Sequence, residues 1–136
     1  MVDLEYNKRI AISSDLDGLR ECIELSQNIS GIFQLDNDKS FAFQTVLLEA
    51  VNNAIVHGNK SNKDLLTIVT VKINSDKIFI EVEDQGDGFD LDLVASPVNG
   101  GNISLESGRG IFFIRQLSDG FNTVGKGNIV NIIIKR

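Results

Sequence analysis

Apolar residues recur every three or four positions between residues 41 and 60, FAFQTVLLEAVNNAIVHGNK. This spacing is typical of a helix that buries one face in a core. Glu49 and Asn53 interrupt the pattern, and because they lie four residues apart they share one face of the helix. Burying such groups without partners is costly, so we expect them to face solvent, a partner or a ligand. The apolar stripe itself consists of Phe43, Leu47, Ala50, Val51, Ala54 and Ile55.

The residues before this helix predict a strand followed by another helix. Residues 6–13, YNKRIAIS, have the composition of a short opening strand. In the helix that follows, Ser14 is the expected capping residue, and acidic residues lie near the positive end of the helix dipole. Cys22 falls on the apolar face of this helix and is expected to be inert core packing. Up to Gly31, that face is expected to consist of Leu16, Leu19, Ile23, Ser26 and Ile29.

After the central helix the pattern changes to β-branched and aromatic residues that partly alternate with polar ones. Two strands, residues 66–74 and 77–84, are predicted, with a tight turn at Ser75-Asp76. A long loop without helical or strand period then runs to Ser107, and its length is typical of a functional lid or of a misassigned element. The remaining predicted elements are a helix over residues 111–118, opened by Gly108-Arg109-Gly110, and a hairpin over residues 121–125 and 128–135.

This order of elements predicts one α+β domain over residues 1–136. We expect a two-layer sandwich in which a mostly antiparallel, mixed sheet carries three helices on one face. The helix with Glu49 and Asn53 would then lie next to the lid.

Composition narrows the classes of function. The net charge of −6, without a basic cluster, argues against a nucleic-acid partner. A single cysteine excludes an internal disulfide and fits a reducing compartment. Since no apolar run approaches the length of a membrane span and the first residues lack the core of a signal peptide, we expect a cytoplasmic protein without membrane contact.

Four polar or glycine-containing motifs converge if this layout is correct. Free N–H groups at a helix N-terminus favour phosphate oxygens, and glycines permit close backbone approach. Each motif also has a purely structural interpretation as a turn, a helix start or a solvated face, and His57 is more simply a helix-end polar residue than a base or ligand. The motifs are the Glu49/Asn53 pair, Asp84-Gln85-Gly86-Asp87-Gly88, Ser107-Gly108-Arg109-Gly110 and Gly125-Lys126-Gly127.

Taken together in this order, the motifs resemble the ATP-binding (Bergerat) fold of the GHKL family, which is shared by gyrase, Hsp90-type chaperones, histidine kinases and MutL. Residues 49–54, EAVNNA, resemble the N box of that family, Asp84-x-Gly86-x-Gly88 its first glycine box and Gly108-Arg109-Gly110 its second. Within the family, the segments LLEAVNNAIVHGN and GRGIFFIRQLSD are most similar to the bacterial anti-sigma-factor serine kinases.

The resemblance implies a role for each motif. Asp84 would accept the adenine amino group, while Gly86 and Gly88 let the base lie close. Asn53 would hold Mg²⁺, which takes few protein ligands and several phosphate oxygens. Glu49 would orient or deprotonate a serine hydroxyl on a partner protein.

The phosphates are assigned in the same way. They would be received by Ser107, Gly108 and Gly110 with their helix dipole. The resemblance does not fix the cations: Arg109 is our candidate if a lid cation must neutralise the γ-phosphate, and Lys60 is either a phosphate contact at the end of the central helix or a solvated lysine. The final glycine box departs from the family pattern, because Asn128 replaces the small hydroxyl residue often found there.

The resemblance therefore implies an ATP- and Mg²⁺-dependent protein serine kinase that acts as an anti-sigma factor. Its partners would be a sigma factor and an anti-sigma-factor antagonist that carries the substrate serine, and it would form a homodimer through the first helix and strand. The main alternative is a nucleotide-gated binding module with little or no kinase activity. A histidine kinase catalytic domain ranks lower, because no dimerisation helix with a phosphorylatable histidine is present in the chain. A domain that binds no nucleotide would leave the four motifs unexplained.

Overall fold

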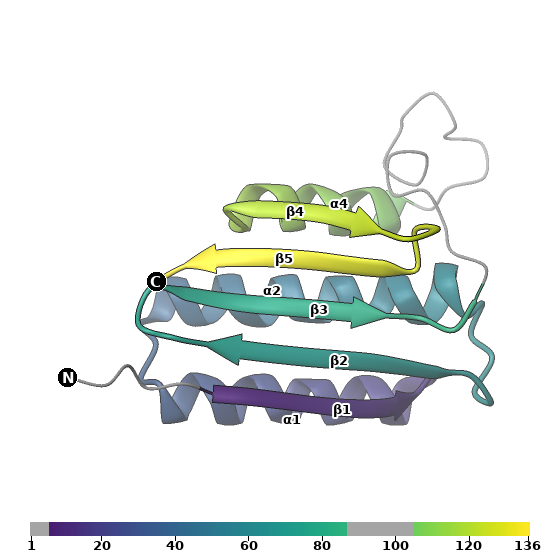
Figure 1. The fold of residues 1–136 in the computed structure, drawn as a ribbon, viewed down its shortest axis with the longest axis horizontal. Coiled ribbons are helices and arrows are strands. Elements are labelled where there is room, and N and C mark those ends of the chain that lie inside the picture. Colours follow the sequence, from purple (N-terminus) through teal and green to yellow (C-terminus); the bar gives the residue numbers. More distant parts are fainter. Residues whose placement is uncertain (1–5, 87–104) are drawn as a thin grey trace.

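A five-stranded sheet with helices on one face forms the protein, as the computed structural model of residues 6–86 and 105–136 shows (Figure 1). The strand order is β1-β2-β3-β5-β4, and all four neighbouring pairs are antiparallel. The elements are β1 (Tyr6–Ser13), α1 (Leu16–Ile32), α2 (Asn37–Asn53), the π-helical turn η1 (Ala54–Gly58), β2 (Leu66–Ile73), β3 (Lys77–Glu83), α4 (Leu105–Leu117), β4 (Gly120–Val124) and β5 (Ile129–Lys135).

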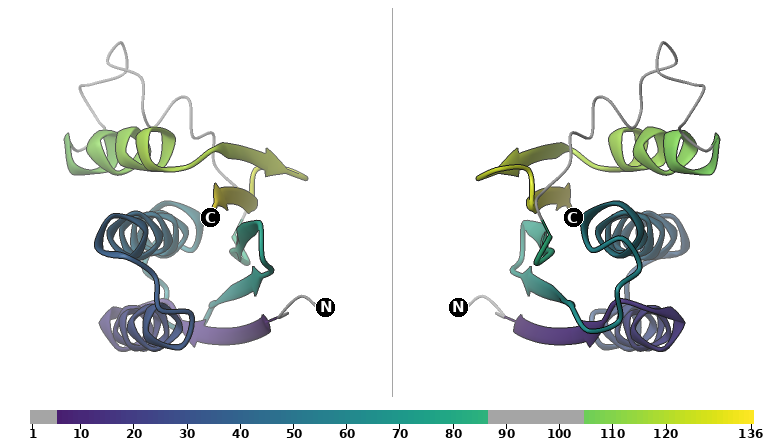
Figure 2. Two further views of the ribbon diagram at one scale, coloured as in Figure 1. Left: turned by 90° about the vertical axis from the view of Figure 1, so that its left-hand side faces the viewer. Right: turned by 90° about the vertical axis from the view of Figure 1, so that its right-hand side faces the viewer.

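Two layers are visible when the molecule is turned by 90°, with the helices on one side and the sheet on the other (Figure 2). The predicted α+β sandwich is thus confirmed. The expected mixed sheet is not seen, because every strand pair in the described part of the chain is antiparallel. None of the helices described there combines the length and the apolar character needed to cross a bilayer.

The core lies between α2 and the inward face of the central strands. Alternate residues of β2, β3 and β5 point toward the helices, as a pleated strand requires. The register places Ile78 opposite Ile134 and Ile80 opposite Ile132, and all four are at most 1% exposed. The predicted apolar stripe, which runs along α2 into η1, is confirmed, because every one of its six residues is buried. Each fully buried aliphatic side chain contributes about 1.5–3 kcal/mol, so these layers define the fold.

The start of α1 differs from the expectation. Asp15, not Ser14, caps the helix, and its carboxylate accepts the Gly18 N–H at 3.0 Å. Ser14 is instead buried and donates its hydroxyl to the Leu65 carbonyl at 2.7 Å. Leu16, now the first helical residue, is 75% exposed and does not join the core.

Cys22 behaves as expected for a core residue. It has no exposed surface, and burial raises the pKa of its thiol to about 12. A thiol held in its protonated form is a poor nucleophile. The buried face of α1 differs in composition from the expected one and consists of Gly18, Cys22, Ser26, Ile29 and Ser30.

Two helix boundaries also differ. The central helix begins at Asn37, where the Asp36 side chain accepts the Lys39 N–H at 2.7 Å, and its α-helical part ends at Asn53. The chain then widens into η1, in which the Asn59 N–H donates to the Ala54 carbonyl at 2.8 Å. A single π-helical turn of this kind is rare and is frequently found at functional sites.

The last helix starts earlier than predicted. Since α4 begins at Leu105, the Gly108-Arg109-Gly110 motif lies within its first two turns and not ahead of it. The expected lid before it falls on residues 87–104, which lie outside the described residues.

Candidate functional site

The first part of the candidate site is the carboxyl end of β3, where Asp84 is 3% exposed. The Asp84 N–H donates to the Asn128 carbonyl at 2.9 Å, which joins the end of β3 to the start of β5. One carboxylate oxygen, Oδ1, accepts the Gly86 N–H at 2.9 Å. These backbone contacts fix the carboxylate and leave its second oxygen for a further hydrogen bond.

The turn η1 brings Gly58 directly against this carboxylate. A Cβ at Gly58 would lie 2.3 Å from Asp84 Oδ2, so the Asp84 side chain occupies the space that any other residue would need. Gly86 is equally confined, because its Cβ would lie 1.9 Å from the Gly58 carbonyl oxygen. Gly86 was predicted from its motif, whereas Gly58 was predicted only to end the helix.

Asn59 holds these segments together. It is 1% exposed, and its amide nitrogen donates to the Ser14 hydroxyl at 2.8 Å and the Leu66 carbonyl at 3.0 Å. A third contact reaches the Thr67 hydroxyl at 3.2 Å. Its amide oxygen accepts the Gln85 N–H at 2.8 Å, within the loop that carries Gly86. One side chain therefore fixes the Asp84 loop relative to the ends of β1 and β2.

The Asp84 carboxyl is electrostatically unusual. Burial raises its pKa above the usual range, the Gly86 N–H opposes that rise, the Glu83 carboxylate adds to it, and the Lys126 charge opposes it. Lys126 belongs to the Gly125-Lys126-Gly127 turn, in which both glycines have positive φ, +67° and +91°. The fourth motif thus lies beside Asp84, as the predicted layout requires.

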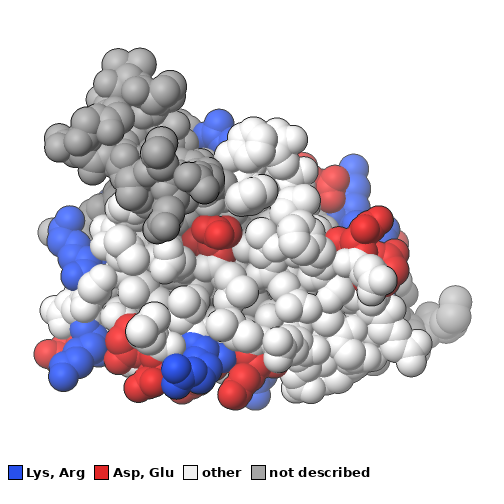
Figure 3. Space-filling model, turned by 180° about the vertical axis from the view of Figure 1, so that it is seen from behind, with Lys and Arg blue, Asp and Glu red and all other residues white. Residues whose placement is uncertain are grey.

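The second part of the site is the contact between α2 and α4. A Cβ at Gly110 would lie 2.4 Å from Glu49 Oε2, so the absence of a side chain on α4 makes room for the Glu49 carboxylate. Glu49 is half-buried and is the one charged residue between Ser40 and Val56. On the helix face, charged side chains gather along the edge formed by α1, and few lie over the middle (Figure 3).

Asn53 lies one helical turn after Glu49 and is 2% exposed. Its amide nitrogen is buried and has no hydrogen-bond partner among the described residues, which is an unusual state for a native side chain. A group completed by a ligand explains such an orphan, and the amide oxygen is a donor atom that Mg²⁺ accepts. The described residues contain no cluster of three or more His, Cys, Asp or Glu that could bind a metal alone, so an ion here would need phosphate oxygens as well.

Both parts of the site lie along one continuous stretch of chain, because η1 follows α2 without a break. Glu49 and Asn53 belong to α2, and Gly58 carries the chain to Asp84. A molecule that reached from Asp84 to Glu49 would therefore lie along this end of α2.

Several predicted site residues are not placed by the structure. Gly88 lies outside the described residues, as do the side chains of Ser107 and Arg109, although these two and Gly108 belong to α4. Lys60 is exposed and follows η1 with a left-handed φ of +53°.

The charge of Lys60 also affects the pKa of His57, the single histidine in the sequence. Burial, and secondarily the Lys60 charge, lower the pKa of His57 below its usual range. His57 is therefore neutral at pH 7, which fits the simple interpretation of a polar residue at the end of the helix.

Comparison with known proteins agrees with this geometry. Residues 12–134 match the model of a family described as histidine kinase-like ATPase domain. An anti-sigma F factor from Clostridium beijerinckii is 31% identical over 96 residues, which cover 68% of this chain and 67% of that protein. An anti-sigma F factor from Priestia megaterium is 35% identical over 95 residues, which cover 66% of this chain and 65% of the relative.

A serine-protein kinase RsbW from Staphylococcus epidermidis is 34% identical over 94 residues, which cover 64% of this chain and 59% of that protein. The matched part thus spans between 59% and 67% of the length of these three relatives. The family match is longer and includes both Asp84 with its neighbouring glycines and the contact between Glu49 and Gly110. The chain belongs to the family of histidine kinase-like ATPase domains.

Proposed function

We propose that this chain is an ATP-dependent protein serine kinase that acts as an anti-sigma factor. It would phosphorylate a serine of an anti-sigma-factor antagonist and sequester a sigma factor. The names of the relatives, two anti-sigma F factors and a serine-protein kinase, support this proposal. The observation that carries it is the placement of a half-buried carboxylate, Glu49, one turn before the unpaired amide of Asn53 and along the same stretch as Asp84.

The adenine would bind at Asp84. Its carboxylate accepts the exocyclic amino group, and Gly86 with Gly58 leaves the edge of the pocket free of side chains. Asn53 would hold Mg²⁺, which neutralises phosphate charge when bound. Ser107, Gly108 and Gly110 would receive the phosphates near the start of α4, and Arg109 and Lys60 are the candidate cations.

Glu49 would act on the substrate serine. Its carboxylate accepts the hydroxyl proton as the serine oxygen forms a bond to the γ-phosphorus, while the bond from that phosphorus to the β–γ bridging oxygen breaks. ADP leaves with the electron pair of that bond. Gly110 would let the Glu49 carboxylate pack directly against α4, because a glycine has no side chain to fill that space.

The oligomeric part of the proposal concerns α1 and β1. Within the described part of the chain β1 is an edge strand of eight residues, and the backbone groups on its outer side pair with no other strand there. A homodimer through the first helix and strand would cover this edge.

The alternative is a nucleotide-gated binding module with little or no kinase activity. Intact Glu49, held against Gly110, favours the kinase, because a pure binding module has no use for a positioned base. Transfer of label from γ-labelled ATP to a purified antagonist protein tests the choice. Label on a serine supports the kinase, whereas ATP binding and sigma-factor capture without label support the module.

Gly110→Ala tests the positioning of Glu49. The new methyl group would overlap the carboxylate and displace it, and a displacement of about 1 Å is expected to lower phosphoryl transfer by about a hundredfold. Gly31→Ala is the matched control, because apart from its own stretch of helix no described atom lies within 4 Å of its Cβ, and this substitution should leave transfer unchanged. Equal transfer rates in the two variants would show that Gly110 is not needed to position Glu49 for the reaction.

Asn59→Ala tests whether Asn59 sets the shape of the nucleotide pocket. We expect the loss of its hydrogen bonds to lower the free energy of unfolding by about 2–3 kcal/mol and to weaken ATP binding by about tenfold. Ser14→Ala removes the hydroxyl that contacts Asn59, Leu65 and Thr67 but leaves the bond from the Gln85 N–H to Asn59 intact. It should lower stability alone, as measured by denaturant unfolding and by ATP titration. A parallel loss of affinity in both variants would show that only general stability matters.

A further inference from the structure

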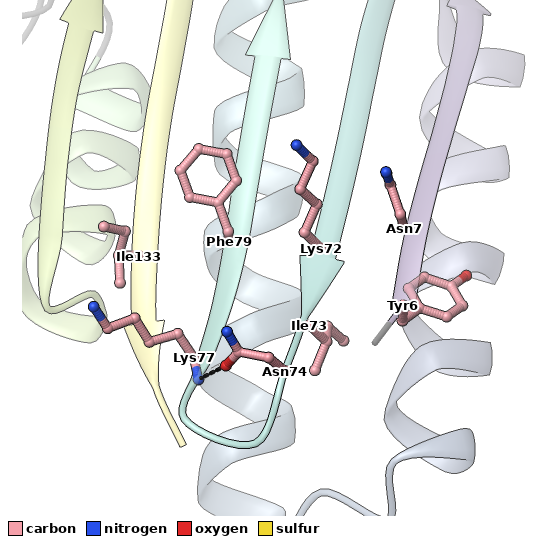
Figure 4. Close-up of a pocket in the computed structure, with 8 residues that line it drawn as sticks. All are labelled: Tyr6, Asn7, Lys72, Ile73, Asn74, Lys77, Phe79 and Ile133. Atoms are coloured by element: carbon pink, nitrogen blue, oxygen red, sulfur yellow. Dashed lines mark hydrogen bonds between the residues drawn. The ribbon is translucent and has the colours of Figure 1, made fainter. Parts of the chain in front are cut away.

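A pocket of about 520 Å³ lies on the face of the sheet opposite to the helices, near the β2–β3 hairpin (Figure 4). Lys77, at the start of β3, lines it, whereas Asp84 follows the other end of that strand. The pocket is thus separated from the nucleotide site by the length of β3 and opens on the other face.

The strand register explains how its side chains meet. Asn7, Lys72, Phe79 and Ile133 are successive cross-strand neighbours on β1, β2, β3 and β5. Directly opposite residues of antiparallel strands have Cβ atoms about 4.5–5.5 Å apart, so these four side chains form one row. Lys77 is two residues before Phe79 and lies on the same face.

The floor of the pocket is apolar and its sides are cationic. Phe79 and Ile133 are half-buried, while Lys72 and Lys77 are exposed on either side of the phenyl ring (Figure 4). Neither ammonium group makes an ion pair or a side-chain hydrogen bond within the part of the chain that the structure describes. None of the described residues that line the pocket is an Asp or a Glu.

Neighbouring groups strengthen the positive charge. Lys135 is the cross-strand partner of Lys77, and the Arg136 guanidinium donates to the Asn74 carbonyl at 2.8 Å. Among the residues that the structure describes, carboxylates in this region are Asp76 in the hairpin, Asp119, which accepts the Lys135 N–H, and Glu81, two residues beyond Phe79 on the same face. A local cluster of cations in a chain of net charge −6 attracts anions to this one end of the molecule.

We propose that this pocket, named here the Lys72–Lys77 pocket, docks a short acidic segment of a partner protein through an apolar anchor. The anchor would lie on Phe79 and Ile133, and flanking carboxylates would pair with Lys72 and Lys77. Charge complementarity selects this occupant: a second copy stacked over the same pocket about a two-fold axis would bring like charges together. The site is on the opposite face from Glu49, so it can be filled while the nucleotide site is in use.

The test uses the full chain, labelled with ¹⁵N, and a capped peptide Glu-Asp-Leu-Phe-Glu-Asp as the probe. We expect saturable amide shifts centred on residues 72, 77, 79 and 133. Lys72→Glu and Lys77→Glu should each weaken binding by at least about tenfold, as should Phe79→Ala, which removes the floor. Lys63→Glu makes the same charge change at an exposed loop residue and should alter the affinity by less than about twofold.

Three results would overturn the proposal. The first is the lack of saturable shifts, or equal effects of Lys72→Glu and Lys63→Glu. The second is that inorganic phosphate shifts the same amides as strongly as the peptide does, which would mean that the pocket recognises negative charge alone. The third is a concentration-dependent shift of the same amides without peptide, which would assign this face to self-association. ATP binding should be unchanged in every variant, so failure here is distinguishable from failure of the proposed function.

Discussion

Glu49→Gln is expected to retain ATP binding and to lower phosphoryl transfer by about 10²–10⁴-fold, the loss typical of removing a positioned base. The substitution keeps the size of the side chain, so Gly110 still accommodates it and the core residues of α2 are undisturbed. The amide cannot take the proton from a serine hydroxyl. Steady-state transfer to the antagonist and ATP titration, performed on the same preparation, separate the two effects.

The control for this variant is Glu24→Gln, which makes the same chemical change at an exposed residue of α1. It should transfer phosphate at the rate of the unmodified protein. If Glu49→Gln also kept that rate, Glu49 would have no part in the reaction and another group would have to accept the serine proton.

Asp84→Asn is expected to remove most of the ATP affinity without loss of stability. A hydrogen bond to a charged group is worth about 1.5–3 kcal/mol, so the affinity should fall by roughly ten- to hundredfold or more. The effect on folding has the opposite direction. Since burial raises the pKa of Asp84, its carboxyl contributes stability below the unfolded pKa, and this contribution is lost as the pH rises through the folded pKa.

At neutral pH the ionised Asp84 is therefore a cost to the fold, and a neutral amide removes it. The free energy of unfolding of Asp84→Asn at pH 7 should equal or exceed that of the unmodified protein, as measured by denaturant titration. ATP binding is followed by equilibrium dialysis. Asp64→Asn, at an exposed loop position, is the matched control and should change neither quantity. If Asp84→Asn retained its affinity for ATP, the adenine would have to bind elsewhere.

The strands and the central helix could be predicted from the sequence because local patterns determine them. The opening strand was predicted with the bounds that β1 has, and β2 and β3 each end one residue before the predicted limit. In each case alternation places residues such as Val71 and Ile80 on the inward face, and the register follows from the short hairpin.

The features that could not be predicted depend on tertiary contacts. The π-helical turn was missed because helical periodicity continues through residue 55, whereas the close approach of Gly58 to Asp84 is a tertiary contact that periodicity does not encode. Ser14 was expected to cap α1, but the buried Asn59 side chain binds its hydroxyl, and Asp15 caps the helix instead.

The candidate site was predictable in its parts but not in its geometry. The motifs at Glu49, Asn53 and Asp84 were recognised from residue types and order. The contact between Glu49 and Gly110 joins residues that are far apart in the sequence, and the spacing within either motif does not encode it. The role of Asn59 in joining these segments by hydrogen bonds was not predicted. The one signal for it in the sequence is weak, namely a polar residue directly after the glycine that ends a helix.

The most direct test of the nucleotide site is the affinity for ATP relative to GTP, measured by titration calorimetry with Mg²⁺ present. Asp84 can accept the amino group of adenine, whereas guanine presents a carbonyl oxygen at the corresponding position and would meet the carboxylate unfavourably. A site built around that hydrogen bond should prefer ATP by at least about a hundredfold. Equal binding of the two nucleotides would contradict the placement of the base at Asp84.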